Sequence, residues 1–406
     1  MGYFGQAVTG ISWVSAFRAS TRGIAFVRTI ILARILTPNQ FGVFGIVSLT
    51  ITFLEILMET GVNVVLIQKK EGMDEYLDTA WVVSIIRGIL ISTTLILLAP
   101  VIASFFNSPD SKNLIYLVSL VPLTRGFINP GIVRFQKDLR FRTEFWFRFI
   151  VFAFDSLIAI FVSVLTQSAI GLVWGLLAGA MLELVMSYIF VKPRPHFGFQ
   201  PEKLKEILSK GKWITGAGVF QFLFRQGDDG VVGKMLGEGS LGIYQIAYKI
   251  CSLPISEVTD VFGRVTFPLY VKLSADIPRL KAAFLKTTLT ITLLALLVGS
   301  ILFIFGGEII RIFLGEKWLA AVPLVKILSI FGIIQAIGNS MNSLFLALEK
   351  QEYVTLVTFI GVLGLGISIV PLTLNYGLNG AVWAPLAGSL VAAPLSVGLV
   401  IRVLRK

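Results

Sequence analysis

The sequence is poor in the residue types that build disulfides and metal centres. Of its 406 residues, one is a cysteine, Cys251, and one is a histidine, His196. A single cysteine excludes an intrachain disulfide, and a lone histidine in a basic loop has no second histidine with which to form a His-based metal site. We therefore expect neither a metal ion nor a cofactor.

Signatures of common enzyme classes are also missing. The chain contains no HExxH, no GxSxG and no Walker A sequence, and the nearest string to the last, GDDGVVGKM, lacks its spacing and its Ser or Thr. The longest connection expected on the outer side, residues 306–317, is too short to hold an active site. These absences predict that the protein is not an enzyme and favour transport.

Charged residues are scarce, at 14% of the chain, whereas 55% of the residues are hydrophobic and the mean hydropathy is +0.85. Many apolar stretches are long enough to cross about 30 Å of hydrocarbon. We predict an all-α polytopic membrane protein with about twelve transmembrane helices, at residues 8–35, 41–66, 79–106, 112–133, 144–166, 169–191, 213–236, 241–270, 282–305, 318–347, 353–374 and 378–401.

Lysines and arginines outside these spans gather in alternate connections and at both termini. By the positive-inside rule, both termini are cytoplasmic, which requires an even number of spans. The formal charge of +12 is explained by this topology together with a cationic interior, so nucleic acid is not an expected partner. The first apolar segment lacks a cleavage site for a signal peptide and is expected to stay in the mature protein.

The chain partly repeats itself after 200 residues. ARILTPNQFGVFGIV in the first half aligns with GKMLGEGSLGIYQIA in the second, and Trp13 aligns with Trp213. Because six spans precede and six follow a basic loop, the halves have the same orientation, which is a parallel repeat. We predict a six-helix bundle at 1–195, a basic linker with an amphipathic interfacial helix at 196–212, and a second six-helix bundle at 213–406, with a cavity between the bundles.

Arginines near the middle of the first span are the main functional signal. Arg18 and Arg22 share a helical stripe with Ser15 and Thr29, and Arg28 lies roughly 80° to its side. A guanidinium at bilayer depth costs at least about 2.5–3.5 kcal/mol, so it must face protein, water or an anionic cargo. An arginine excess suits phosphate, for which Arg is a bidentate donor that stays charged. Arg225, in the first span of the second half, is a further candidate.

Other charges inside the membrane have two interpretations. Structural ion pairs are expected for Glu59 with Arg87, which lie at similar depth on neighbouring spans, and for Asp260 with Arg264. Arg125 and Arg148 are close enough to the cytoplasmic boundary for their charges to reach water. Coupling to H⁺ or Na⁺ needs a carboxylate that changes protonation. A buried acid is suited to this, because burial disfavours its ionised form and raises its pKa. The candidates, which the sequence does not rank, are Asp155, Asp228, Asp229, Glu257 and Asp260.

Four segments, ARILTPNQFGVFGIV, GVNVVLIQKKEGMDEYLDTAWVVSIIRG, LGIYQIAYKICSLP and FGRVTFPLYVKLS, make the chain resemble the polysaccharide transporter family. This family comprises Wzx-like flippases for O-antigen of lipopolysaccharide, exopolysaccharide and teichuronic acid, within the multidrug/oligosaccharidyl-lipid/polysaccharide exporter superfamily. The likeness covers essentially the whole chain and implies two six-helix bundles in a bacterial or archaeal cytoplasmic membrane.

The resemblance also implies the cargo: an undecaprenyl-diphosphate-linked oligosaccharide, moved to the outer leaflet by alternating access. A polysaccharide polymerase and its chain-length machinery are the implied protein partners. By position, the diphosphate-binding arginines of related flippases fall on Arg18 and Arg22, and less directly on Arg28. The chain lacks the two extra C-terminal spans of peptidoglycan-precursor flippases, which argues against a lipid II cargo.

Two other functions remain open from the sequence. A cation-coupled multidrug exporter of the same superfamily would favour an acidic, aromatic cavity, which the arginine excess opposes. In a non-transporting scaffold of a glycan assembly complex, all internal charges would be structural pairs.

Overall fold

The computed structural model describes residues 3–68 and 72–405, and no strand is present in these ranges. The chain divides into two compact units, the first extending to Gly227 and the second beginning at Asp228. The first unit contains α1 (Tyr3–Ile35), α2 (Pro38–Leu57), α3 (Val62–Gln68), α4 (Met73–Phe105), α5 (Pro109–Val118), α6 (Leu120–Gly126), η1 (Pro130–Val133), α7 (Arg134–Lys137), α8 (Phe141–Thr166), α9 (Ile170–Phe190) and the start of α10 (Pro201–Leu273).

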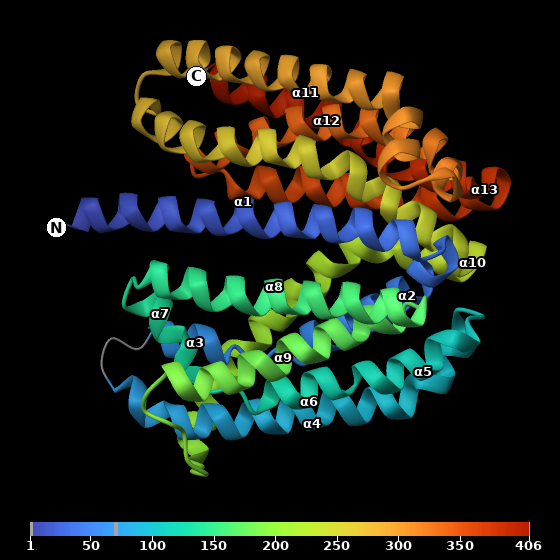
Figure 1. Ribbon diagram of the computed structural model, residues 1–406. Helices are drawn as coiled ribbons and strands as arrows, with labels where there is room; N and C mark the ends of the chain where they lie inside the picture. Colours follow the sequence, from blue (N-terminus) through green and yellow to red (C-terminus); the bar gives the residue numbers. More distant parts are fainter. Residues whose placement is uncertain (1–2, 69–71, 406) are drawn as a thin grey trace. The chain divides into compact units, whose positions relative to one another are not determined.

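The second unit contains the rest of α10 and the helices drawn from yellow to red in Figure 1. These are α11 (Ile277–Phe313), the 3₁₀ turn η2 (Glu316–Ala321), α12 (Val322–Ala347) and α13 (Gln351–Leu404). Within this unit α12 packs against both α11 and α13.

Two of these helices are each a pair of spans joined at a glycine. The backbone of α10 leaves helical geometry at Gly237 (φ 81°, ψ 176°), and that of α13 does so at Gly377 (φ 58°, ψ −137°). Both φ values are positive, a conformation that glycine adopts without a Cβ penalty. The two breaks fall between the spans predicted at 213–236 and 241–270, and at 353–374 and 378–401, which confirms those boundaries.

Two predicted spans differ from the structure. The span expected at 41–66 ends at Leu57, because Gly61 (φ 71°) turns the chain before α3. The span expected at 112–133 consists of α5 and α6, interrupted at Ser119. Pro122 has no N–H to donate to the carbonyl of Val118, so the helical hydrogen-bond ladder is broken there.

Seven helices in the described part of the chain are long and apolar enough to cross a membrane: α2, α4, α8, α9, α11, α12 with its preceding turn, and α13. α1 and α10 are not in this group, and α1 carries four arginines. With α5 and α6 counted as one span, and α10 and α13 as two each, the helices provide the predicted twelve.

The internal repeat coincides with matching breaks in the two halves. α1 and α2 are separated at Thr37, whose hydroxyl accepts a hydrogen bond from Gln40 N while Gln40 Oε1 accepts one from Thr37 N. The corresponding break of the second half is at Gly237, 200 residues later. Gly42 and Gly242, six residues after the aligned Leu36 and Leu236, are both buried.

Close packing of α8 on α9 depends on a glycine at every fourth position of α9 (Figure 1). A Cβ on Gly171 would lie 2.2 Å from Ser163 Oγ, and one on Gly175 would lie 2.6 Å from both Ala159 Cβ and Asp155 Oδ1. Such small residues let two membrane helices approach at backbone distance. This packing buries Asp155 between the two helices.

The linker expected at 196–212 packs on the first unit. Leu204 and Ile207 join a core formed by α3 and α4, whereas Leu208 of the same helical segment is 48% exposed. The interfacial role of this segment stays a prediction. The Tyr76 hydroxyl donates to Glu206 Oε2 at 2.8 Å, and Lys203 Nζ lies 3.7 Å from Glu75 Oε2. The polar face is thereby attached to the first turns of α4.

Candidate functional site

One face of α1 lies along α8 in the first unit (Figure 1). Trp13 and Phe17 pack against Phe145, with ring centroids 5.2 and 6.3 Å apart. Arg28 follows on the same side of the helix, because fifteen residues from Trp13 correspond to four full turns plus about 60°. This face is aromatic at its start and cationic further along.

Arg28 is engaged by an acid on α8. Its Nη1 donates to Asp155 Oδ2 at 3.1 Å, and the two side chains are only 13% and 11% exposed. We expected Arg28 to bind substrate and Asp155 to couple transport to an ion. In the structure the two form a single ion pair, so Arg28 reaches an anionic cargo only if this pair opens.

Arg18 and Arg22 lie on a different side of α1. On the helical period Arg18 is rotated by about 100° from Phe17, and Arg22 by about 140°. Arg18 is exposed and Arg22 is half-buried. Arg28, which the sequence places roughly 80° from the stripe of Arg18 and Arg22, is thus held inside the unit. Arg18 and Arg22 lie on a neighbouring face of α1.

A hollow of about 210 Å³ opens between α1, α6, α8 and α9, and Asp155 is in its wall. Two further arginines line it. Arg125 Nη1 lies 2.8 Å from Glu55 Oε1, and Arg148 Nε lies 2.8 Å from Glu144 Oε1. From the sequence we assigned both arginines only to the membrane boundary; the signal that was overlooked is the spacing of Glu144 and Arg148, four residues apart on α8.

The expected pair of Glu59 and Arg87 is present. Arg87 Nη2 donates to Glu59 Oε2 at 2.8 Å and to the carbonyl oxygen of Glu55 at 2.6 Å. The pair therefore ties α4 to the end of α2, a structural role for a charge inside the membrane.

The acids of the second unit lie on the two arms of α10. Tyr244 Oη donates to Asp228 Oδ2 at 2.7 Å, and Gln245 Nε2 donates to Asp229 Oδ2 at 3.3 Å. Glu257 is half-buried. The side chains of Asp260 and Arg264 lie outside the described residues, so their predicted pair stays a prediction.

Arg225 is the remaining substrate-binding candidate. Its side chain is exposed, at the end of the first unit. Asp228 and Asp229, the nearest acids in the sequence, are bonded to Tyr244 and Gln245. The binding role of Arg225 stays a prediction.

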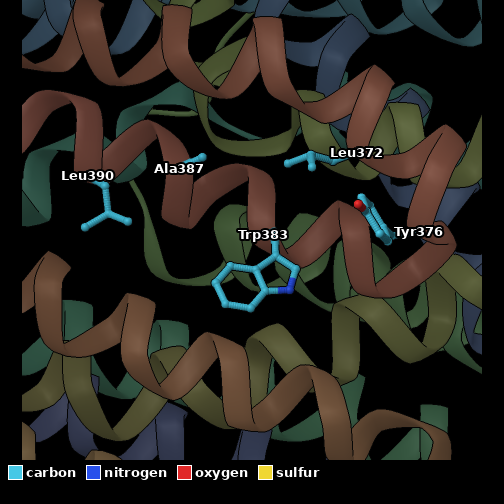
Figure 2. A pocket seen from close by; sticks show the side chains of 5 residues that line it. All are labelled: Leu372, Tyr376, Trp383, Ala387 and Leu390. Atoms are coloured by element: carbon cyan, nitrogen blue, oxygen red, sulfur yellow. The ribbon is translucent and has the colours of Figure 1, made fainter.

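A second hollow, of about 390 Å³, lies on α13. Figure 2 shows its five side chains, which come from both sides of the break at Gly377: Leu372, Tyr376, Trp383, Ala387 and Leu390. None of them is charged, so this hollow has no cation to pair with a phosphate. The candidate site is therefore the charged interior of the first unit.

Comparison with known proteins gives a consistent result. Residues 31–323 match the family model described as polysaccharide biosynthesis protein. The teichuronic acid biosynthesis protein TuaB of Bacillus subtilis is 27% identical over 362 residues, covering 86% of this chain and 72% of TuaB. The lipopolysaccharide biosynthesis protein WzxC of Escherichia coli is 23% identical over 354 residues, covering 86% and 71%.

Among solved structures, the lipid II flippase MurJ in an inward closed conformation is similar, with a TM-score of 0.77 and 15% identity over 97% of this chain and 89% of that one. Identity at this level shows the fold alone. The chain has the two-lobed fold of twelve helices that its sequence predicts.

Proposed function

The chain belongs to the polysaccharide biosynthesis protein family, and from this premise we propose that it is a flippase for a lipid-linked oligosaccharide. The cargo is an oligosaccharide on undecaprenyl diphosphate, moved from the cytoplasmic to the outer leaflet of the cytoplasmic membrane by alternating access. A polymerase that consumes the translocated unit is the expected partner. TuaB and WzxC, both named for the synthesis of surface polymers, support this assignment.

The observation that carries the proposal is the cationic first span. Arg18, Arg22 and Arg28 all lie within a single helix of 33 residues. Guanidinium groups donate in pairs to phosphate oxygens and stay charged at every physiological pH. The diphosphate of the lipid carrier supplies the matching anion, whereas a cationic drug would be repelled by these residues.

Among the coupling candidates, Asp155 is the one that we favour. It holds Arg28 directly, whereas Asp228 and Asp229 are bonded to the neutral side chains of Tyr244 and Gln245. Uptake of a proton by Asp155 would release Arg28 toward the diphosphate, and loss of that proton would recapture it. Arg125 and Arg148 line the same hollow as Asp155.

The test is complementation of cells that lack the native gene. Arg18→Ala/Arg22→Ala should reduce surface glycan at least about tenfold, because each lost charged hydrogen bond weakens cargo binding by about 1.5–3 kcal/mol. Protein abundance in the membrane should be unchanged. The matched control is Arg279→Ala, whose side chain is 79% exposed at the start of α11.

Each competing function makes a different prediction. A scaffold would support normal glycan levels with both arginines removed, and a multidrug exporter would retain drug resistance without them. Full export by the double variant would refute the flippase assignment.

A further inference from the structure

The hollow in the first unit differs from a phosphate site in its charge. Its wall holds two guanidinium groups, Arg125 and Arg148, and two carboxylates, Asp155 and Glu183. Each arginine also has an acid outside the wall, since Arg125 pairs with Glu55 and Arg148 with Glu144. Because every guanidinium of the wall is paired with a carboxylate, the wall gives no net attraction to an anion. It instead offers donors and acceptors side by side to a neutral polar ligand.

One wall carboxylate has capacity for hydrogen bonds from a ligand. Asp155 is already engaged, because its Oδ2 accepts from Arg28 and its Oδ1 is buried against Gly175 of α9. Glu183 on α9 is half-buried in the wall and is the carboxylate that a ligand can reach. Hydroxyl groups are the donors that such an acceptor would bind.

The hollow also has an aromatic surface. Phe17 from α1 and Phe152 from α8 line it, and Phe17 is held edge-on against Phe145. Flat aromatic faces pack against the C–H face of a sugar ring, while the ring hydroxyls are left to the polar groups around its edge. The volume of about 210 Å³ is below that of sites for drug-sized ligands. It suits one sugar ring and excludes a whole oligosaccharide.

The position of the hollow agrees with delivery of a cargo from the cytoplasm. In the predicted topology, Arg125, Arg148 and Glu183 all lie toward the cytoplasmic ends of their spans. A sugar attached to a carrier lipid in the inner leaflet would reach this depth before the diphosphate moved. The neighbouring Arg28 would then be next to the bound headgroup.

We propose that this hollow is a subsite for one sugar ring of the cargo headgroup, separate from the phosphate-binding arginines of α1. This inference rests on the proposed flippase function. Phe17 and Phe152 pack on the ring, Glu183 accepts hydrogen bonds from its hydroxyl groups, and Arg125 and Arg148 donate to its oxygens. The subsite would let the protein select a glycosylated carrier over a bare one.

The experiment compares two probes in proteoliposomes that contain the full chain: a short polyprenyl diphosphate, and the same lipid bearing one N-acetylhexosamine. Phe152→Ala and Glu183→Gln should each slow movement of the glycosylated probe about tenfold, the usual effect of a lost pocket contact or an unpaired polar group. Movement of the bare probe should be unchanged. The control is Phe154→Ala, on the same helix, 38% exposed and outside the hollow.

The outcomes separate the subsite from the transport function. If the wild type moves both probes and the two variants slow them equally or not at all, the subsite is refuted while the flippase assignment stands. If the wild type moves neither probe, or if Arg18→Ala/Arg22→Ala moves both at the wild-type rate, the flippase assignment itself fails. Unchanged tryptophan fluorescence and elution volume establish that each variant is folded.

Discussion

The ion pair of Arg28 and Asp155 allows a quantitative test of how α1 is held on α8. At an Nη1–Oδ2 distance of 3.1 Å and an effective dielectric constant of about 20, the attraction is about 5 kcal/mol before desolvation. Loss of hydration by both groups offsets much of this gain. Removing one partner, however, leaves the other charge buried, which costs about 3–5 kcal/mol.

We therefore expect Asp155→Asn and Arg28→Met each to lower the free energy of unfolding by about 3 kcal/mol. The double variant Arg28→Met/Asp155→Asn should lose less than the two single losses combined, with a coupling energy of about 2 kcal/mol, because no charge is left alone. For a unit of this size, 3 kcal/mol corresponds to a fall in Tm of about 6–12 °C.

Thermal unfolding in detergent, followed by tryptophan fluorescence, is the assay. Five of the seven tryptophans, Trp13, Trp81, Trp146, Trp174 and Trp213, belong to the first unit, so the signal reports mainly on that unit. Arg148→Met is the control, because its pair with Glu144 is 46% exposed at the arginine and should contribute no more than about 1 kcal/mol. Strictly additive losses in the double variant would refute a direct interaction of Arg28 with Asp155.

Three further predictions follow from the packing. Gly175→Ala should destabilise the first unit by about 1–3 kcal/mol and reduce export, because the new Cβ would lie 2.6 Å from Ala159 Cβ. A Cβ on Gly366 would have no atom within 4 Å, so Gly366→Ala should neither destabilise the protein nor reduce export. Equal losses for both variants in thermal unfolding would contradict this explanation. Arg87→Ala should lower the free energy of unfolding by about 1–3 kcal/mol, because Arg87 donates to Glu59 and to the carbonyl of Glu55. The flipping rate per folded molecule should be unchanged. A slower rate at normal stability would instead assign Arg87 to transport. Cys251, which is 3% exposed, should react with maleimide far more slowly in the native protein than after unfolding in SDS, and fast native labelling would show that this part of α10 opens.

Some contacts inside the membrane could be predicted from the sequence. Glu59 and Arg87 lie on consecutive antiparallel spans, so counting residues from the shared membrane boundary gives both the same depth. The breaks at Gly237 and Gly377 fall in the connections predicted at residues 237–240 and 375–377, because the apolar stretch on each side has the length of one span.

Other contacts could not be predicted in this way. Arg28 and Asp155 are 127 residues apart, and Arg125 and Glu55 are 70 apart. The helical period gives the side of the helix that each residue occupies, but it does not give the helix that lies opposite. For this reason Arg28 was grouped with the substrate-binding arginines, and Arg125 was assigned only to the membrane boundary. The pair of Arg148 with Glu144, four residues apart on α8, could have been predicted from helical spacing.

The sequence by itself determined the number of spans and the breaks near Gly237 and Gly377, because hydrophobic length and backbone freedom are properties of each segment alone. The family also follows from the sequence, through its matching residues. Only the tertiary structure decided which charges meet. Asp155 lies against Arg28 because Gly171 and Gly175 allow α9 to approach α8 closely and α1 covers the same face, and this arrangement depends on three helices packing together.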